Sequence, residues 1–431
     1  MSAIDLSSYF VSDPSAARQM VSPVIADMLG SKILKIAGEV RAMMASGRSV
    51  CNLTVGDFRP QHFPIPAALS EQVQRAYVDQ QTNYPPADGI PELKQAVADL
   101  YTRELGLAYG PESVCIGSGA RPPLYGSWAL FTQPGDQTVS FLPAWNNGYY
   151  AHLFQTKHVY VPTTAETNFF PTIDQVREIL PGTRMVAMNS PLNPTGTAIS
   201  KDVLAGIAQA IVEENQARSR RGEAPAMVLY DQVYWMLTAS ETRHHNPVQL
   251  VPEIAPYVVN VDAISKCFAA TGLRVGWAVL PPYLQGRMRA LIGHVGAWAP
   301  RPEQVATAWL LNHPDVMHAY MAEMRARIAA RLNTLYDGIT AMKSRGLPVE
   351  AISPQGGIYL SFRVNLIGRG FSTNEEIRHY LLNSAGVAVV PFQAFDLTDD
   401  SGWFRMSVGA VGVGELDDAL ERIEKAIQAK L

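Results

Sequence analysis

Lys266 is the residue whose surroundings most clearly favour chemistry. It lies in the segment Asp262-Ala-Ile-Ser-Lys-Cys-Phe, just after a predicted strand that ends near Val261. An amine at the carboxyl end of a buried strand is partly desolvated, which lowers its pKa and makes it a usable nucleophile. A single lysine in a loop is more often a solvated surface residue, so this interpretation depends on the polar groups nearby.

Three further polar segments each follow a predicted strand directly. They are residues 117–121 after the strand 114–116, residues 189–197 after the strand 185–188, and residues 231–234 after the strand 227–230. In open α/β sheets, ligands bind at the carboxyl ends of the strands. We therefore expect all four segments to meet at one edge of one sheet.

Short apolar runs alternate with helical patterns along most of the chain. The predicted strands are 114–116, 138–141, 158–161, 185–188, 227–230, 258–261 and 277–280, and the predicted helices between them are 66–79, 91–105, 121–131, 201–217 and 282–291. Strands that are apolar on both faces and alternate with helices predict an α/β fold. We expect a mostly parallel, seven-stranded sheet with helices on both faces. The basic stretch 217–225 is expected to be a solvated connector.

The last third of the chain has a different pattern. A long helical zone at 302–344 is followed by predicted strands at 358–363, 387–390 and 404–408 and by helices at 373–384 and 413–430. This mixture predicts a second, smaller α+β domain. The segment before residue 60 contains one predicted helix, 33–45, and we expect it to join this domain. The predicted division is a large domain at 62–310 and a small domain formed by 1–61 and 311–431.

The composition excludes several classes of protein. The chain has 431 residues, 47% of them hydrophobic, and a formal net charge of −4, which is typical of a folded protein without a nucleic-acid partner. Cys51, Cys115 and Cys267 are scattered, so we expect no metal site, no disulfide framework and a cytoplasmic location. We also expect no signal peptide and no membrane span, since no apolar run is long enough.

Four motifs carry a resemblance to a known family. They are Asn193-Pro-Thr-Gly196, Asp231-x-x-Tyr234, Ser265-Lys266 and Thr271-Gly-Leu-Arg-Val-Gly276. In this order, with these strands before them, they make the chain resemble the class I/II aminotransferases of the aspartate aminotransferase group. These are enzymes of fold type I that use pyridoxal 5'-phosphate (PLP), and the resemblance extends from Leu53 to the C-terminus.

The resemblance implies roles for four residues around the cofactor ring. Lys266 forms the Schiff base with PLP and later shuttles the substrate proton. Asp231 pairs with the pyridine nitrogen and keeps it protonated, although an Asp after a strand is often only a helix N-cap. Tyr234 and Asn193 hydrogen-bond the phenolic oxygen; the alternatives are a helix-face aromatic for Tyr234 and a turn residue for Asn193. The family often has a cis peptide before Pro194, and we expect one here.

The resemblance also implies a phosphate site at a helix start. Gly119, Ala120 and Arg121 would offer backbone N–H groups to the phosphate dianion. Arg274 would add a charged donor, and Ser265 would add a hydroxyl. Many relatives have a second serine where this chain has Ala263, which removes one donor. The Arg121 side chain is left open between the phosphate, a substrate carboxylate and a surface role.

The remaining implied contacts concern the ring face, the substrate and a neighbouring subunit. Trp145 would cover the ring, unless it is only a core residue. Tyr84 would reach the phosphate of a neighbouring subunit, which implies a homodimer with a shared site, unless it is only a loop tyrosine. Gly56, Asn193 and Arg405 would bind the substrate α-carboxylate; the alternative for Arg405 is a surface charge on an edge strand.

The resemblance implies transamination between an L-amino acid and a 2-oxo acid such as 2-oxoglutarate. The donor is left open between aspartate, for which Arg301 would supply a second cation, and an aromatic amino acid, for which Trp298 would form a pocket. The alternative is a PLP-dependent lyase, decarboxylase or synthase on the same fold. A PLP-sensing domain fused to a DNA-binding module is disfavoured because residues 1–60 lack a basic helix-turn-helix pattern. A nucleotide-binding protein is disfavoured because the usual glycine-rich motifs are missing.

Overall fold

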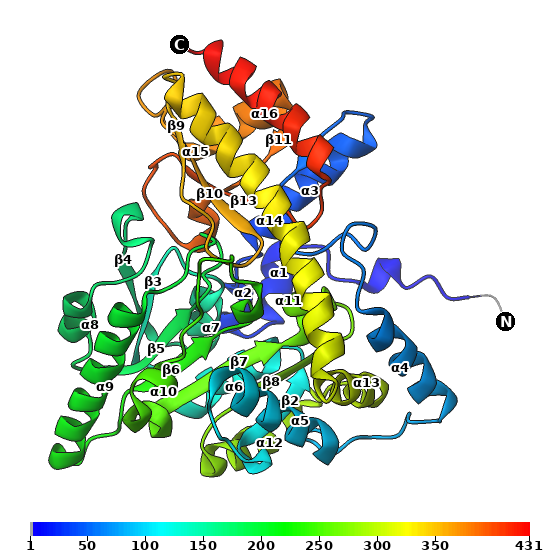
Figure 1. Ribbon diagram of the computed structural model, residues 1–431, viewed down its shortest axis with the longest axis vertical. Helices are drawn as coiled ribbons and strands as arrows, with labels where there is room; N and C mark the ends of the chain where they lie inside the picture. The colour runs from blue at the N-terminus through cyan, green and yellow to red at the C-terminus, as the bar shows by residue number, and fades with distance from the viewer. Residues whose placement is uncertain (1–2) are drawn as a thin grey trace.

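A seven-stranded sheet forms the centre of the larger part of the molecule in the computed structural model, which describes residues 3–431 (Figure 1). Its order is β2-β8-β7-β6-β5-β3-β4, and only β8 runs antiparallel to its neighbours. The strands are β2 (Val114–Ser118), β3 (Gln137–Leu142), β4 (Lys157–Pro162), β5 (Thr183–Asn189), β6 (Met227–Asp231), β7 (Val258–Ala263) and β8 (Val275–Val279). The predicted mostly parallel α/β sheet is confirmed.

Helices cover both faces of this sheet because its strands are apolar on both sides. Along β6, Met227 and Leu229 pack in the cluster that includes α6 and α12, whereas Val228 and Tyr230 pack in the cluster that includes α5 and α9. The helices are α4 (Ala67–Val78), α5 (Pro91–Leu100), α6 (Arg121–Phe131), α7 (Asn147–Leu153), α8 (Ile173–Ile179), α9 (Lys201–Arg221), α10 (Pro247–Leu250), α11 (Ile264–Cys267), α12 (Pro282–Val295) and α13 (Arg301–Leu311).

The smaller part is an α+β unit, as predicted. Its four-stranded antiparallel sheet has the order β12-β13-β10-β9, so β13 is an inner strand. The elements are β9 (Val349–Ala351), β10 (Tyr359–Val364), β12 (Val390–Pro391), β13 (Trp403–Ser407), α14 (Pro314–Ser344), α15 (Asn374–Tyr380) and α16 (Val413–Gln428). The predicted helical zone at 302–344 is two helices, because Pro314 starts α14 after a break. Figure 1 shows α14 running from the large sheet domain to this unit.

The N-terminal segment contributes to the small unit. Its strand β1 (Cys51–Asn52) pairs in parallel with β11 (Val387–Ala388), and α3 (Lys32–Ala45) matches the one predicted helix. Two short helices, α1 (Pro14–Gln19) and α2 (Pro23–Ala26), were not predicted, because each is too short to show a helical period.

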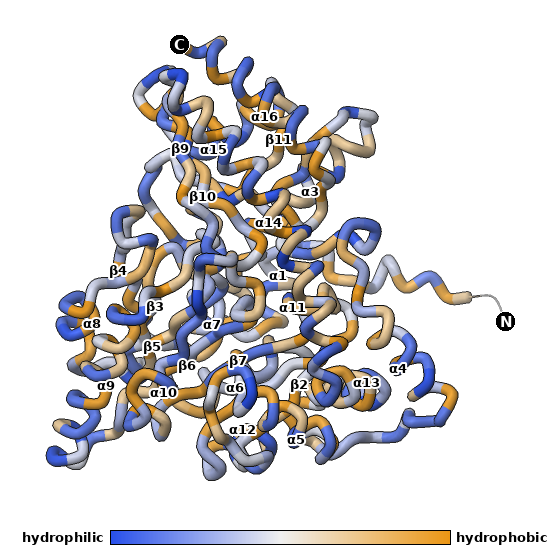
Figure 2. Tube along the Cα trace, viewed as in Figure 1, coloured by the Kyte–Doolittle hydropathy of each residue, from blue (hydrophilic) through white to orange (hydrophobic). Residues whose placement is uncertain are grey.

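Hydropathy separates the interior from the surface. Figure 2 shows apolar residues along the central strands and alternating polar and apolar residues on outer helices such as α9. The N-terminal segment is an exception, since large apolar side chains are exposed there, among them Tyr9, Phe10 and Leu29. Within residues 3–431, no helix combines the length and the apolar character needed to cross a membrane.

The basic stretch 217–225 is the expected solvated connector only in part, because residues 219–224 are exposed but Arg218 is buried and the first half is helical. Helix α9 continues through it to Arg221, and Gly222 ends the helix in a left-handed conformation. Arg218 is only 5% exposed. Its guanidinium donates to the carbonyl oxygens of Leu180 and Thr183 and pairs with Glu214 at 2.8 Å. Arg218 therefore fastens the end of α9 to the segment that precedes β5.

Candidate active site

Lys266 lies at the carboxyl edge of the large sheet, together with the ends of β2, β5 and β6. It belongs to the one-turn helix α11, not to a loop as the sequence suggested, because the chain turns helical directly after β7. Its Nζ donates to the carbonyl oxygen of Gly56 at 2.6 Å and lies 5.9 Å from the centre of the Tyr234 ring. The amine therefore faces a segment from the N-terminal part of the chain.

Asp231 is a buried acid at the end of β6, with 9% of its surface exposed. Burial raises its pKa to about 7, against the opposing effects of the Val233 N–H and the charge of Lys266. The Val233 N–H donates to Oδ1 at 3.2 Å. The short helix that follows begins after Tyr234, so Asp231 is not its N-cap. A carboxyl group in this environment favours a partner that brings a proton or a positive charge.

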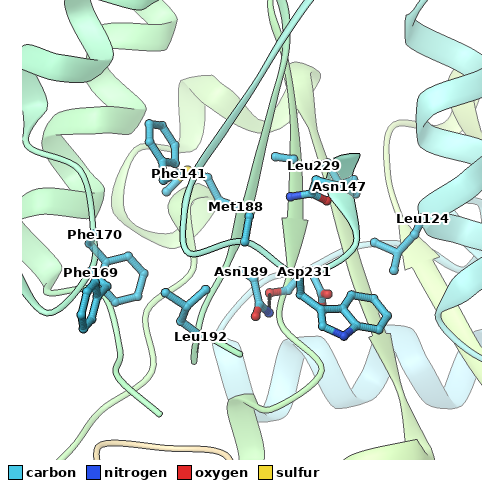
Figure 3. A pocket seen from close by; sticks show the side chains of 13 residues that line it. Leu124, Phe141, Asn147, Phe169, Phe170, Met188, Asn189, Leu192, Leu229 and Asp231 are labelled. Carbon is cyan, nitrogen blue, oxygen red and sulfur yellow. Dashed lines mark hydrogen bonds between the residues drawn. The ribbon is translucent and has the colours of Figure 1, made fainter. Parts of the chain in front are cut away.

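Asn189 supports Asp231 from the neighbouring strand β5. Its Nδ2 donates to the backbone carbonyl of Asp231 at 2.8 Å (Figure 3), and its Oδ1 accepts from the Asn193 N–H at 2.9 Å. Asn189 and Asp231 line a pocket whose other walls are mostly apolar, with Leu124 on one side and Phe169 on the other. Asn189 has no role of its own in the sequence-based prediction, although it is the first residue of the polar segment 189–197 that includes Asn193.

Arg405 is a cation buried at the junction of the two parts. It is 1% exposed and lies on the inner strand β13, so it is not an edge-strand surface charge. Its Nη1 donates to Oδ1 of Asn193 at 2.9 Å and its Nη2 to the carbonyl of Thr54 at 2.7 Å, while its Nε has no partner among residues 3–431. Burial lowers the pKa of Arg405, and no carboxylate in the described chain pairs with it. A buried guanidinium without a counter-ion is costly, so this position favours an anionic ligand.

Tyr234 is buried beside a second tyrosine that sequence reasoning missed. The hydroxyl oxygens of Tyr234 and Tyr359 lie 2.7 Å apart, and burial raises the pKa of Tyr234. Asn193 accepts a hydrogen bond from Arg405 at the junction of the two parts. The Asn193–Pro194 peptide is cis, as expected. Tyr359 carries no motif of its own, because its role depends on which strand lies opposite Tyr234 in the fold.

The residues predicted to bind a phosphate lie where β2 meets α6. Helix α6 begins at Arg121 and no side chain caps it among the described residues. Arg274 has a positive φ of 56° and donates to the carbonyl oxygens of Thr271 at 2.7 Å and Ser118 at 3.1 Å. A Cβ at Gly119 would collide with the Arg274 guanidinium, so glycine is needed for this approach. The cation and the helix start together suit an anion.

Three other predicted residues occupy the rim of this site. The Arg121 guanidinium lies 4.9 Å above the ring of Trp145, which is half-buried and lines the pocket with Asp231. Ser265 is buried next to Lys266. Tyr150, which the sequence did not indicate, is buried close enough to Arg121 that the arginine charge opposes the rise in its pKa.

Tyr84 and Arg301 are not brought to Lys266 within the chain. Tyr84 is 82% exposed and packs edge-to-face on Trp298, with ring centres 5.5 Å apart. Arg301 starts α13, and its Nε donates to Oε1 of Gln81 at 3.0 Å. These contacts of the two residues, with Trp298 and with Gln81, do not include a residue of the site around Lys266.

Known proteins match this chain over almost its whole length. Residues 48–423 match the family described as aminotransferase class I and II. The aspartate aminotransferase of Rhizobium meliloti (strain 1021) is 30% identical over 408 residues, which cover 92% of this chain and 93% of the relative. That of Bacillus sp. (strain YM-2) is 27% identical over 417 residues, 95% of this chain and 100% of the relative.

Solved structures give the same result. The aspartate aminotransferase from Thermus thermophilus with maleate matches with a TM-score of 0.84 at 27% identity, and the match covers 94% of this chain and 99% of that one. The family match spans both sheets and every segment of the site described above. The chain therefore belongs to the class I and II aminotransferase family.

Proposed function

We propose that this aminotransferase uses PLP, held at Lys266, to transfer an amino group between an L-amino acid and a 2-oxo acid such as 2-oxoglutarate. The observation that carries the proposal is the Lys266 amine, whose charge acts on the buried acid Asp231 and which donates to the Gly56 carbonyl. Gly56 lies two residues after Thr54, whose carbonyl accepts from the buried cation Arg405. The family is named for this reaction, so a lyase, decarboxylase or synthase is not favoured.

The residues present fit this cofactor. Ala120 and Arg121 offer backbone N–H groups and Arg274 offers a guanidinium to a phosphate dianion, whereas the Gly119 N–H donates to the Gly117 carbonyl at 2.8 Å. The missing Cβ of Gly119 is what lets the Arg274 guanidinium lie against this loop. Ser265 offers a hydroxyl, and Ala263 offers none. Trp145 offers a flat aromatic face beside Asp231. When bound, PLP supplies an aldehyde that reacts with amines and a ring that withdraws electrons from the substrate α-carbon.

Each polar side chain then has one task. Lys266 Nζ would hold the cofactor and would carry the proton that leaves the substrate α-carbon. The Asp231 carboxylate would hold a proton on the ring nitrogen, which its buried position favours. The side chains of Tyr234 and Asn193 would donate to the phenolic oxygen. Arg405 would bind the substrate α-carboxylate, assisted by Asn193 and by the backbone at Gly56.

We propose aspartate as the first amino donor to test. Several relatives are named aspartate aminotransferase, and one match is an aromatic aminotransferase from Pyrococcus horikoshii. A second carboxylate requires a second cation, and the candidates are Arg121, at the rim of the site, and Arg301, which would have to come from a neighbouring subunit. An aromatic donor is favoured instead if the Tyr84–Trp298 pair lines the side-chain pocket.

We propose a homodimer in which Tyr84 reaches the phosphate in the neighbouring subunit. The supporting observations are the exposed Tyr84 and Trp298 pair and the exposed apolar residues near the N-terminus, such as Phe10 and Leu29. The domain boundaries stay a proposal, with 62–310 as the large domain and 1–61 and 311–431 as the small one; the β1–β11 pairing supports them. A cytoplasmic location is proposed because Cys51, Cys115 and Cys267 are all buried thiols.

The test is substitution of the proposed cofactor lysine. Lys266→Ala protein, incubated with PLP and dialysed, is expected to lose the yellow absorbance of the bound cofactor and the transfer of amino groups from aspartate to 2-oxoglutarate. Lys201→Ala, at an exposed helix start, is the matched control and is expected to keep both. If Lys266→Ala keeps full transfer activity, the proposal is wrong.

A further inference from the structure

Two neighbouring strands of the small domain contact the two residues proposed to face the phenolic oxygen of the cofactor. Tyr359 on β10 lies 2.7 Å from Tyr234, hydroxyl to hydroxyl, and Arg405 on β13 donates to Asn193 at 2.9 Å. Strands β10 and β13 pair directly, with Ser361 opposite Arg405. The small domain therefore contacts the proposed cofactor site through these two hydrogen bonds. The proposed function gives a role to Arg405 and none to Tyr359.

The geometry around Tyr359 is fixed by the backbone. Strand β10 is attached to the large domain where Ser361 Oγ donates to the carbonyl of Thr195 at 2.8 Å. Just before β10, the N–H groups of Gln355 and Gly356 donate to the Gly196 carbonyl at 2.8 and 3.0 Å. Tyr359 is 1% exposed, so water does not compete for its hydroxyl. The contact with Tyr234 is therefore held by the fold.

The direction of this hydrogen bond follows from the number of protons. A tyrosine hydroxyl donates one hydrogen bond and accepts others. If Tyr234 donates to the phenolic oxygen, it has no second proton for Tyr359, so Tyr359 must donate to Tyr234. Hydrogen bonds in such a chain polarise one another, and the second bond strengthens the first.

We propose that Tyr359 is a positioning residue, whose hydroxyl donates to Tyr234 and so strengthens the hydrogen bond from Tyr234 to the phenolic oxygen of the cofactor. This inference rests on the proposed function. The charged groups that face the tyrosine pair are Arg405, 4.6 Å above the Tyr359 ring, Lys266, 5.9 Å from the Tyr234 ring, and Asp231. All three remain in place when only the Tyr359 hydroxyl is removed.

The cofactor absorbance reports on this bond. The phenolic oxygen accepts from Tyr234 and also from the protonated nitrogen that Lys266 contributes to the chromophore. If Tyr234 becomes a weaker donor, the oxygen binds that nitrogen proton more strongly, and the chromophore loses it at a higher pH. The pKa of the chromophore therefore rises when the hydrogen bond from Tyr234 weakens.

The experiment is a pH titration of the absorbance of the PLP-loaded enzyme. Tyr359→Phe keeps the ring that Arg405 packs on and is expected to raise the chromophore pKa by about 0.5 unit, with Tyr234→Phe raising it further. In the Tyr234→Phe background, Tyr359→Phe is expected to cause no additional shift. Tyr380→Phe, which removes a small-domain hydroxyl bonded to the Ala426 carbonyl, is the matched control and is expected to leave the pKa unchanged.

Two results overturn the inference. An unchanged chromophore pKa in folded, loaded Tyr359→Phe shows that its hydroxyl does not act on Tyr234. An equal shift with and without the Tyr234 hydroxyl shows that Tyr359 acts by another route. Should Tyr359→Phe not load, Tyr359→Leu at saturating PLP is titrated instead, with the same expected sign. A wild-type enzyme without any yellow chromophore contradicts the proposed function itself, so the two failures are distinguishable.

Discussion

Arg405 and Asn193 meet across the junction of the two domains, with Nη1 of the arginine 2.9 Å from Oδ1 of the asparagine. Arg405 therefore donates a hydrogen bond to Asn193, which is also proposed to contact the cofactor. Its second anchor, the Thr54 carbonyl, lies two residues before Gly56, whose carbonyl accepts from Lys266. Two contacts therefore fix the position of Arg405 relative to the Lys266 amine. One is with Asn193, and the other is with Thr54 in the segment that Lys266 also contacts.

Arg405→Lys is expected to raise the KM for the amino donor about 100-fold, with a smaller effect on kcat. A lysine keeps the charge but loses the planar pair of donors, and a charge-assisted hydrogen bond contributes about 1.5–3 kcal/mol. Steady-state kinetics with a varied amino donor measure this. Arg363→Lys, on the neighbouring strand, is the matched control. An unchanged KM in Arg405→Lys would remove Arg405 from the substrate site.

Gly119→Ala is expected to weaken PLP binding about tenfold or more, because its Cβ displaces the Arg274 guanidinium. The matched control is Gly222→Ala, which has a similar positive φ, 69° against 77°, but nothing within 4 Å of the added Cβ. Both substitutions carry the same backbone strain of about 1 kcal/mol. Absorbance titration of the apo proteins with PLP separates the two effects. Equal affinities in the two variants would mean that Arg274 does not depend on this glycine.

The sequence predicted the strands and the polar residues that follow them, because both are local. Runs that are apolar on both faces predict a mostly parallel sheet covered by helices. In such a sheet the carboxyl ends of β2, β5, β6 and β7 lie at one edge, as the structure confirms. Tyr359 was missed because it belongs to no motif, and Asn189 was given no role although it begins the polar segment 189–197. Their contacts with Tyr234 and Asp231 exist only once distant strands are packed together.

Charge alone misled the sequence-based interpretation of α9. Three arginines near its end suggested a solvated connector, but Arg218 is buried because carbonyl oxygens at the end of α8 need donors. Pairing with Glu214 offsets part of the cost of burying its charge. The sequence does not tell which of the three arginines contacts the carbonyl oxygens of Leu180 and Thr183, because that depends on how α8 packs against α9.

Asp262 gives the folded protein a measurable dependence on pH. It is a buried residue of the inner strand β7 and accepts from Trp235 Nε1 at 2.6 Å, and burial raises its pKa to about 8. Its native pKa lies above the unfolded value, so its contribution to stability is complete at low pH and is lost as pH rises towards about 8. Asp262→Asn lacks this titration and keeps a hydrogen-bond acceptor.

The difference in free energy of unfolding, Asp262→Asn minus wild type, is therefore expected to increase as the pH rises from 5 to 8. The increase is at most about 1.4 kcal/mol per pH unit. Urea unfolding of the PLP-saturated proteins at several pH values measures the difference. Asp337→Asn, at an exposed position on α14, is expected to show no such gain. A constant difference between Asp262→Asn and wild type over this range would contradict the raised pKa.

The proposed shared site is testable by mixing two impaired proteins. Lys266→Ala lacks the reactive amine, and Tyr84→Ala lacks the aromatic hydroxyl proposed to enter the neighbouring site. In a mixed dimer, the site with an intact Lys266 would receive the intact Tyr84 of its partner. Equal amounts, exchanged at random, place half the chains in mixed dimers with one restored site each, so about a quarter of wild-type activity is expected.

The control for this experiment is a mixture in which both changes lie on the same chain. Double-variant protein mixed with wild type forms mixed dimers that hold no complete site, so its activity falls below the average of the two separate proteins. If the two single variants show no gain on mixing while mass measurements confirm exchange of subunits, Tyr84 acts within its own chain. The edge-to-face contact of Tyr84 with Trp298 would then belong to the site of its own chain.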